Sequence, residues 1–163
     1  MPNYVMNLLE FDGDKKRIAE MLKSIRFDNK YLSCKVNTFD FNKMIQMPEE
    51  IQNSDAWYDW SVDNWGTKWN SFGYDGFNPE TNEPPNDILM FCTAWSAPHP
   101  VIEVLAQKYP DIEIFHTWAD ECIGSNSGRR HYCHGGYDEF IPDTDDEAIE
   151  IGEELWGISE EDD

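Results

Sequence analysis

Residues 87–120 constrain the fold more strongly than any other stretch of this chain. The run Asp87–Trp95 is the most hydrophobic one, and its length is typical of a central strand that is buried on both faces. Apolar side chains then recur at helical spacing across Val101–Ala106, before a Tyr-Pro pair ends the pattern. Asp111–Asp120 alternates apolar and polar side chains, as a half-buried strand does. The pattern therefore predicts a strand–helix–strand unit.

A second unit of this kind is predicted near the N-terminus. Asn3–Phe11 has the loose alternation of a strand, and Asp14 suits the N-cap of an amphipathic helix that ends near Arg26. A short strand is expected at Thr38–Phe41. Two such units in series with an antiparallel centre form the split βαβ, or ferredoxin-like, sandwich, which is an α+β fold.

The C-terminal part adds a strand and a helix to this sandwich. A turn at Gly124–Gly128 precedes a strand that we expect over Arg129–Tyr137. Asp143 or Thr144 then suits the N-cap of a last helix with apolar positions on one face.

The length of 163 residues fits one domain with a sizeable core. We expect residues 1–157 to form a single ferredoxin-like domain, with a tryptophan-rich insertion at 53–86 between the second and third strands. Residues 158–163 are expected to be an acidic, flexible tail. No apolar run is long enough to span a membrane, and the N-terminal pattern is not that of a signal peptide. We therefore expect a cytoplasmic protein whose four cysteines are reduced and which has no membrane partner.

The charge of the chain is strongly negative and unevenly placed. Thirty-three acids stand against twelve bases, and the 27 acids of residues 45–163 face only four bases. From Asp143 onward there are eleven acids and no base. Such a surface repels nucleic acid and attracts a basic protein partner. The alternative is that the acids serve solubility alone.

Four of the seven tryptophans fall between Trp57 and Trp69. Ser54 can cap a helix that Gly66 ends, and the glycines and prolines beyond it indicate irregular structure. The cluster is either a small core of its own or the wall of a ligand pocket. The candidate pocket residues are Trp65, Thr67, Lys68, Trp69, Asn70 and Trp95.

Three segments together resemble a known family. They are FNKMIQMPEEI at 41–51, NWGTKWN at 64–70 and TAWSAPHPVIEVLAQKYPDIEIFHTWADE at 93–121. In order and spacing they resemble the YubB-like family of small bacterial proteins with a ferredoxin-like domain, as far as about residue 140. The resemblance implies that fold and a setting on plasmids, phages and other mobile elements. It brings no catalytic residues with it.

The run His131–His134 (HYCH) contains residue types that bind metals. In a strand, His131 and Cys133 share one face while His134 points away, and no CxxC or HxxxH spacing is present. We therefore expect no metal and no cofactor. Cys92 lies in an apolar strand, which favours an inert thiol, and the chain has no phosphate loop, dinucleotide fingerprint or esterase elbow. These observations disfavour an enzyme without excluding one.

Two functions remain open at this stage. In the first, the chain is a non-enzymatic acidic protein that binds a basic host protein, such as a nucleic-acid-binding or defence protein, with carboxylates standing in for phosphates. The candidate contacts are Asp138, Glu139, Asp145, Asp146, Glu153 and Glu154. In the second, it is a ligand-binding or enzymatic domain with its pocket under the tryptophan-rich insertion.

Overall fold

The computed structural model describes residues 3–27, 39–72 and 87–157, so the tail expected at 158–163 and the later part of the insertion, 73–86, lie outside the described residues. Five strands form one antiparallel sheet in the order β2-β1-β3-β4-β5. The strands are β1 (Tyr4–Asp12), β2 (Ile88–Ala94), β3 (Glu113–Asp120), β4 (Ser127–Cys133) and β5 (Gly136–Phe140). The helices are α1 (Lys15–Ile25), the 3-10 turn η2 (Phe41–Lys43), α2 (Glu49–Gln52), α3 (Trp57–Trp65), α4 (His99–Lys108) and α5 (Asp145–Trp156). Among the described residues, no helix has the length and hydrophobicity that crossing a bilayer requires.

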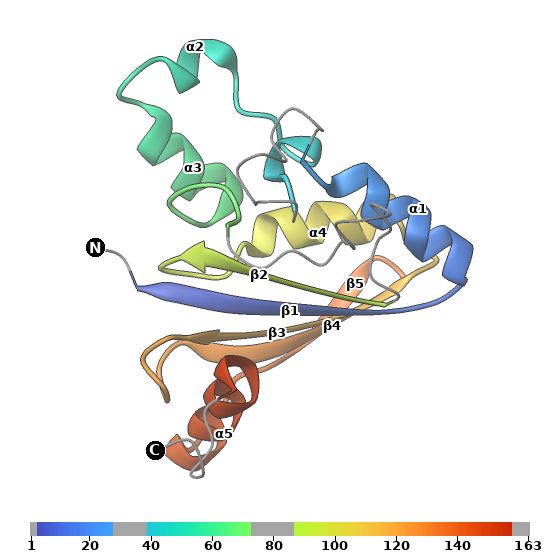
Figure 1. Ribbon diagram of the computed structural model, residues 1–163, viewed down its shortest axis with the longest axis vertical. Coiled ribbons are helices and arrows are strands. Elements are labelled where there is room, and N and C mark those ends of the chain that lie inside the picture. The colour runs from blue at the N-terminus through green and yellow to red at the C-terminus, as the bar shows by residue number, and fades with distance from the viewer. Residues whose placement is uncertain (1–2, 28–38, 73–86, 158–163) are drawn as a thin grey trace.

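The centre of the sheet is the split βαβ arrangement that the sequence predicts. β1 pairs antiparallel with β2 on one side and with β3 on the other, so Val5 lies between Thr93 and Asp120. β2 and β3 are therefore parallel to each other, and α4 connects them above the sheet (Figure 1). The α+β, ferredoxin-like fold class is confirmed.

The strand predicted at Thr38–Phe41 is not found over Phe39–Phe41, and Thr38 itself is not described. Phe39 forms only an isolated bridge with Arg26, and the chain then turns into η2. Both Phe39 and Phe41 are fully buried and pack edge-on against Phe91. The chain turns here because Asp40 caps η2, its side chain accepting a hydrogen bond from the backbone N–H of Asn42 at 3.1 Å.

The strand expected over Arg129–Tyr137 is instead divided into β4 and β5 by a two-residue turn. His134 and Gly135 both have positive φ, at 52° and 83°, and Cys133 pairs with Gly136 across the turn. Two central residues with positive φ form the hairpin turn whose twist matches that of paired strands. The sheet therefore gains a fifth strand at its edge.

The main core lies between the sheet and the helical layer of α1, α3 and α4. The helix-facing side chains of the central strands, such as Leu9 and Ile114, pack there with Leu22 and Ile102. Of the helices that the structure describes, α5 is the one on the opposite face of the sheet (Figure 1). It packs its apolar stripe on Met6, Cys92 and Ala119, forming a second and smaller core.

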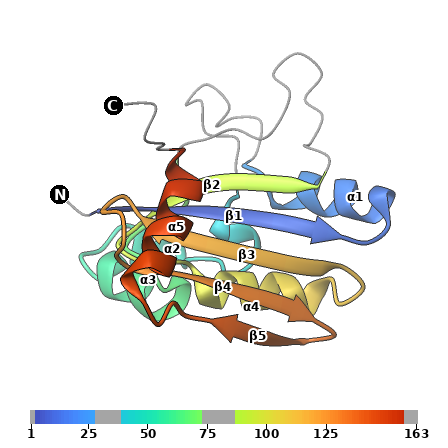
Figure 2. The same cartoon turned by 90° about the horizontal axis from the view of Figure 1, so that it is seen from below.

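α5 has well-defined ends and an open surface beside it. Thr144 is the N-cap, and its hydroxyl accepts a hydrogen bond from the backbone N–H of Glu147 at 3.2 Å. Gly157, with φ of 66°, ends the helix. Figure 2 shows α5 crossing the strands near one end of the sheet, with the other end of that face uncovered by any described helix.

Candidate functional site

Trp65 belongs to the main core. Its ring is 3% exposed, and it meets the rings of Phe41 and Trp60 edge-on at centroid distances of 5.8 and 5.2 Å. The indole Nε1–H donates to the carbonyl of Ile45 at 2.8 Å. With its ring buried and its N–H bonded, Trp65 packs within the domain. Gly66 follows with φ of 78°, and a Cβ at this position would meet the ring of Pro100 at 2.8 Å.

Thr67 and Asn70 use their polar atoms inside the protein. The hydroxyl of Thr67 is buried and donates to the carbonyl of Ala94 at 2.7 Å. The side-chain oxygen of Asn70 accepts from the backbone N–H of Phe41 at 2.9 Å, and its amide nitrogen donates to Asp40 at 2.8 Å. These bonds attach the segment around η2 to the end of β2. For these two residues the geometry favours a small core over a ligand pocket.

Lys68, Trp69 and Trp95 form a patch at the surface. The Lys68 ammonium lies 4.6 Å from the ring centre of Trp69 and 5.1 Å from that of Trp95, in cation–π geometry. Trp95 is 40% exposed, has φ of 75°, and packs edge-on against Tyr58. Of the six pocket candidates, these three therefore have side chains that remain accessible to a ligand.

Two of the six acidic candidates are paired with arginines. Glu139 accepts from Nε of Arg130 and Glu154 accepts from Nη2 of Arg129, both at 2.6 Å. Arg130 also reaches Glu103 on α4 at 3.2 Å, so it connects the edge of the sheet to the helical layer. These two acids therefore have a structural role.

The other four acidic candidates are exposed on β5 and α5. Asp138 lies on β5, Asp145 and Asp146 lie in the first turn of α5, and Glu153 lies near its end. Residues 136–157 contain nine acids and no base. Acids in the first turn are favoured by the helix dipole, whereas an acid near the C-terminal end is disfavoured by it. We call the acidic side chains of β5 and α5 the acidic surface.

A groove of about 590 Å³ lies beside α5 on the same face of the sheet. Phe115, Thr117, His131, Asp138 and Phe140 contribute to its lining. Phe115 is 38% exposed and Phe140 is 43% exposed, so its floor is partly apolar. The groove therefore places an apolar strip next to the acidic surface.

A buried polar network between the sheet and α4 was not predicted. His116 is fully buried, and its Nε2 lies 2.8 Å from the side-chain oxygen of Asn7. Asn7 donates in turn to the hydroxyl of Thr93 at 2.9 Å. His99, at the start of α4, packs edge-on against Trp118 at 4.6 Å. Burial lowers the pKa of His116 well below its usual value and that of His99 to about 4, so both rings are neutral near pH 7.

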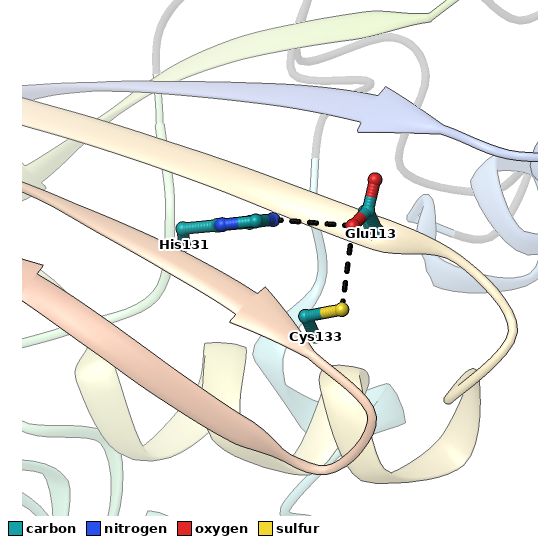
Figure 3. A group of neighbouring side chains, drawn as sticks. All are labelled: Glu113, His131 and Cys133. Carbon is teal, nitrogen blue, oxygen red and sulfur yellow. Dashed lines mark hydrogen bonds and ion pairs between the residues drawn. The ribbon is translucent and has the colours of Figure 1, made fainter.

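Glu113, His131 and Cys133 converge at the end of β3 and β4 that lies away from α5 (Figure 3). The Cys133 thiol donates to Oε1 of Glu113 at 3.3 Å, and Nε2 of His131 lies 3.4 Å from the same oxygen. The bond to Glu113 raises the pKa of the Cys133 thiol, which disfavours a thiolate nucleophile. His131 and Cys133 share one face as predicted. Glu113 was missed because it comes from the neighbouring strand.

Cys92 fits the expectation of an unreactive thiol. It is buried beneath α5, and burial raises its pKa to about 11. A thiol with this pKa is almost entirely protonated near neutral pH, so Cys92 packs as a small apolar side chain.

The comparisons with known proteins concern the fold. Residues 65–159 match the family described as the ferredoxin-like domain in Api92-like proteins. Because this match covers more than half of the chain, the protein belongs to that family. The match continues through α5, whereas the resemblance seen in the sequence was expected to end near residue 140.

One solved structure is similar in part. It is the crystal structure of the protein Api92 from Yersinia pseudotuberculosis, with 15% identity and a TM-score of 0.47. The similarity covers 71% of this chain and 46% of that one, so the chain spans less than half of the length of that protein. The sequence matches none of the curated proteins.

Proposed function

We propose that this chain is a non-enzymatic binding domain that docks on a basic protein through its acidic surface. The observation that carries this proposal is the position of α5. The helix stands apart from the other helices, on the opposite face of the sheet, and it belongs to a segment with nine acids and no base. A basic partner could therefore approach it without meeting the helical layer.

The charges around α5 support the same proposal. Arg129 and Arg130 neutralise Glu154 and Glu139, and no further base follows them in the chain. Glu153 lies where the helix dipole disfavours a negative charge, so its placement is not explained by helix stability. A concentrated negative field accelerates association with a positive surface and makes it sensitive to salt.

We further propose that the partner is a host protein that binds nucleic acid, such as a defence protein, and that the acidic surface mimics phosphates. The resemblance to the YubB-like family suggests a mobile-element setting, in which such inhibition inside the host cytoplasm would be useful. Exposed carboxylates on a rigid helix and an edge strand can present negative charges at regular spacing to a phosphate-binding groove.

The experiment is capture of partners from bacterial lysate by the purified chain at low salt, followed by a salt gradient and mass spectrometry. We expect a basic protein that leaves at moderate salt and that DNA displaces. The double variant Asp146→Asn with Glu153→Gln should weaken its capture. The control is Glu49→Gln with Glu50→Gln, which removes the same charge from exposed positions on α2. It should leave the capture of the partner unchanged. A complex that persists in about 1 M salt, where the screening length is about 3 Å, would contradict the proposal.

The second candidate is a ligand site at the tryptophan-rich segment. It is favoured by the position of the Lys68 ammonium over the rings of Trp69 and the exposed Trp95. Aromatic faces beside a cation can hold a planar or anionic ligand. In a thermal-shift screen, Lys68→Ala should remove a ligand-induced rise in Tm while leaving the Tm of the free protein nearly unchanged. A screen in which no ligand shifts the wild-type Tm would count against this site.

A further inference from the structure

The cluster of Glu113, His131 and Cys133 joins two adjacent strands on the face of the sheet that also carries α5. The register pairs Ile114 with Tyr132 and Phe115 with His131, so Glu113 lies across from Cys133 and diagonally from His131. Side chains in these relative positions are within reach of one another in an antiparallel pair. The oxygen, nitrogen and sulfur atoms of the three groups all lie within 4.8 Å of one another.

The separations agree with those of ligands around one zinc ion. Ligand atoms about 2.0–2.3 Å from a tetrahedral zinc lie about 3.3–3.6 Å from each other. The Oε1 atom of Glu113 lies 3.3 Å from Sγ of Cys133 and 3.4 Å from Nε2 of His131. Two of the three ligand–ligand edges therefore already have the length that a bound ion requires. A small side-chain rotation could shorten the third edge.

The histidine is held in the orientation that metal binding needs. Its ring stacks on Phe115 with a centroid distance of 4.3 Å and an angle of 9° between the planes. Its Nε2 is shielded from solvent and points toward Oε1 of Glu113, which lies 3.4 Å away (Figure 3). This contact is longer than a good hydrogen bond, and an ion placed between the two atoms would replace it with two metal–ligand bonds.

The geometry points to a binding site for a zinc-type divalent transition-metal ion, held by Glu113, His131 and Cys133. Thiolate and imidazole together select zinc and similar borderline ions over calcium and magnesium, which prefer sites made of oxygen ligands alone. Three protein ligands leave the fourth tetrahedral position open. This position is available to water.

The surrounding charge favours a cation at this position. Asp12 pairs with Glu113 across β1 and β3, and Asp138 pairs with His131, so two further carboxylates flank the cluster. His131 and Asp138 also line the groove beside α5, so a metal-bound water would be accessible from the groove. The site shares only Asp138 with the acidic surface, and it does not depend on the proposed docking.

The test uses the full chain, purified under reducing conditions, stripped of metal with a chelator and titrated with Co²⁺. Tetrahedral cobalt bound to a thiolate gives a sulfur-to-cobalt charge-transfer band and intense visible bands. We expect both to saturate at one ion per chain and to disappear when Zn²⁺ is added. Absence of the charge-transfer band at one equivalent of Co²⁺ would overturn the inference.

The variants separate this site from the other cysteines. Cys133→Ser should abolish the charge-transfer band, and His131→Gln should weaken Co²⁺ binding at least about 100-fold, since even residues that only support a ligand typically affect affinity 10- to 100-fold. The matched control is Cys122→Ser, which replaces an exposed cysteine outside the cluster and should leave the spectrum unchanged. Circular dichroism will show whether each variant is folded. A band that survives Cys133→Ser, or one that Cys122→Ser removes, would overturn the inference.

Discussion

Nε2 of His116 lies 2.8 Å from the side-chain oxygen of Asn7, and both residues are fully buried. The amide nitrogen of Asn7 donates to Thr93, so one series of hydrogen bonds connects β3, β1 and β2 within the core. Buried polar groups stabilise a fold only when they are paired. The three central strands therefore depend on a polar contact as well as on apolar packing.

We predict that Asn7→Leu destabilises the protein by about 2–3 kcal/mol. The substitution removes the partner of Nε2 of His116 in the core, whereas the Thr93 hydroxyl keeps its hydrogen bond to the carbonyl of Ser96. An unpaired buried group costs about 1–3 kcal/mol. Urea denaturation measures the change. The control is Asn53→Leu at an exposed position after α2, where we expect a change within about 0.5 kcal/mol. Equal effects of the two substitutions would show that the network contributes nothing.

The buried histidines predict a loss of stability in mild acid. The pKa of His99 is lowered to about 4 by burial and by Arg130, against an opposing effect of Glu139. Burial also lowers the pKa of His116 well below its usual value. In the unfolded chain both histidines titrate near about pH 6.5. The unfolded state therefore binds more protons below that pH, and stability falls as the pH drops from about 6.5 toward 4. The slope is up to about 1.4 kcal/mol per pH unit for the fully buried His116.

Urea denaturation at several pH values between about 7 and 5 tests this prediction. His99→Phe keeps an aromatic ring against Trp118 and removes one of the two groups, so the dependence on pH should become shallower. His134→Gln changes an exposed histidine and should leave the dependence of stability on pH as in the wild type. A wild-type stability that stays constant over this range would contradict the prediction.

Gly128 on β4 is predicted to tolerate no side chain. A Cβ atom there would lie 2.5 Å from the ring of Trp118, its partner across β3 and β4. Gly128→Ala should therefore destabilise the protein by about 1–3 kcal/mol through overpacking. Gly136→Ala is the matched control on β5, because a Cβ there meets no atom within 4 Å. Thermal denaturation should place the Tm of the first variant clearly below that of the second.

Two of the tryptophans named as pocket candidates should respond differently to truncation. Trp65→Ala removes a core ring and should cost about 3–5 kcal/mol. Trp95→Ala should cost clearly less, because the ring of Trp95 is partly exposed. Urea denaturation of both variants gives the comparison. If Trp65→Ala were the milder change, Trp65 would not be the core residue that its packing indicates.

Local sequence patterns predicted the helices and strands whose type depends on residues close together in the chain. The hydrophobic run of β2, the helical spacing of α4 and the alternation of β3 each reflect one element with one buried side, so their type could be derived from residues close in sequence. The end of α3 at Gly66 has the same origin, since only a residue without Cβ adopts its positive φ easily. Gly135 carries a similar signal for the β4–β5 turn, which a continuous strand over Arg129–Tyr137 does not accommodate.

The sequence by itself thus determined the ferredoxin-like class, the placement of His131 and Cys133 on one face of a strand, and the strong negative charge near the C-terminus. Only the tertiary structure decided that Phe39 and Phe41 enter the core without forming a strand, that Asn7 meets His116, and that Glu113 joins the histidine and the cysteine. The physical reason is that periodicity reports which face of an element is buried. The partner on that face is selected by strand register and by the packing of residues far apart in the chain.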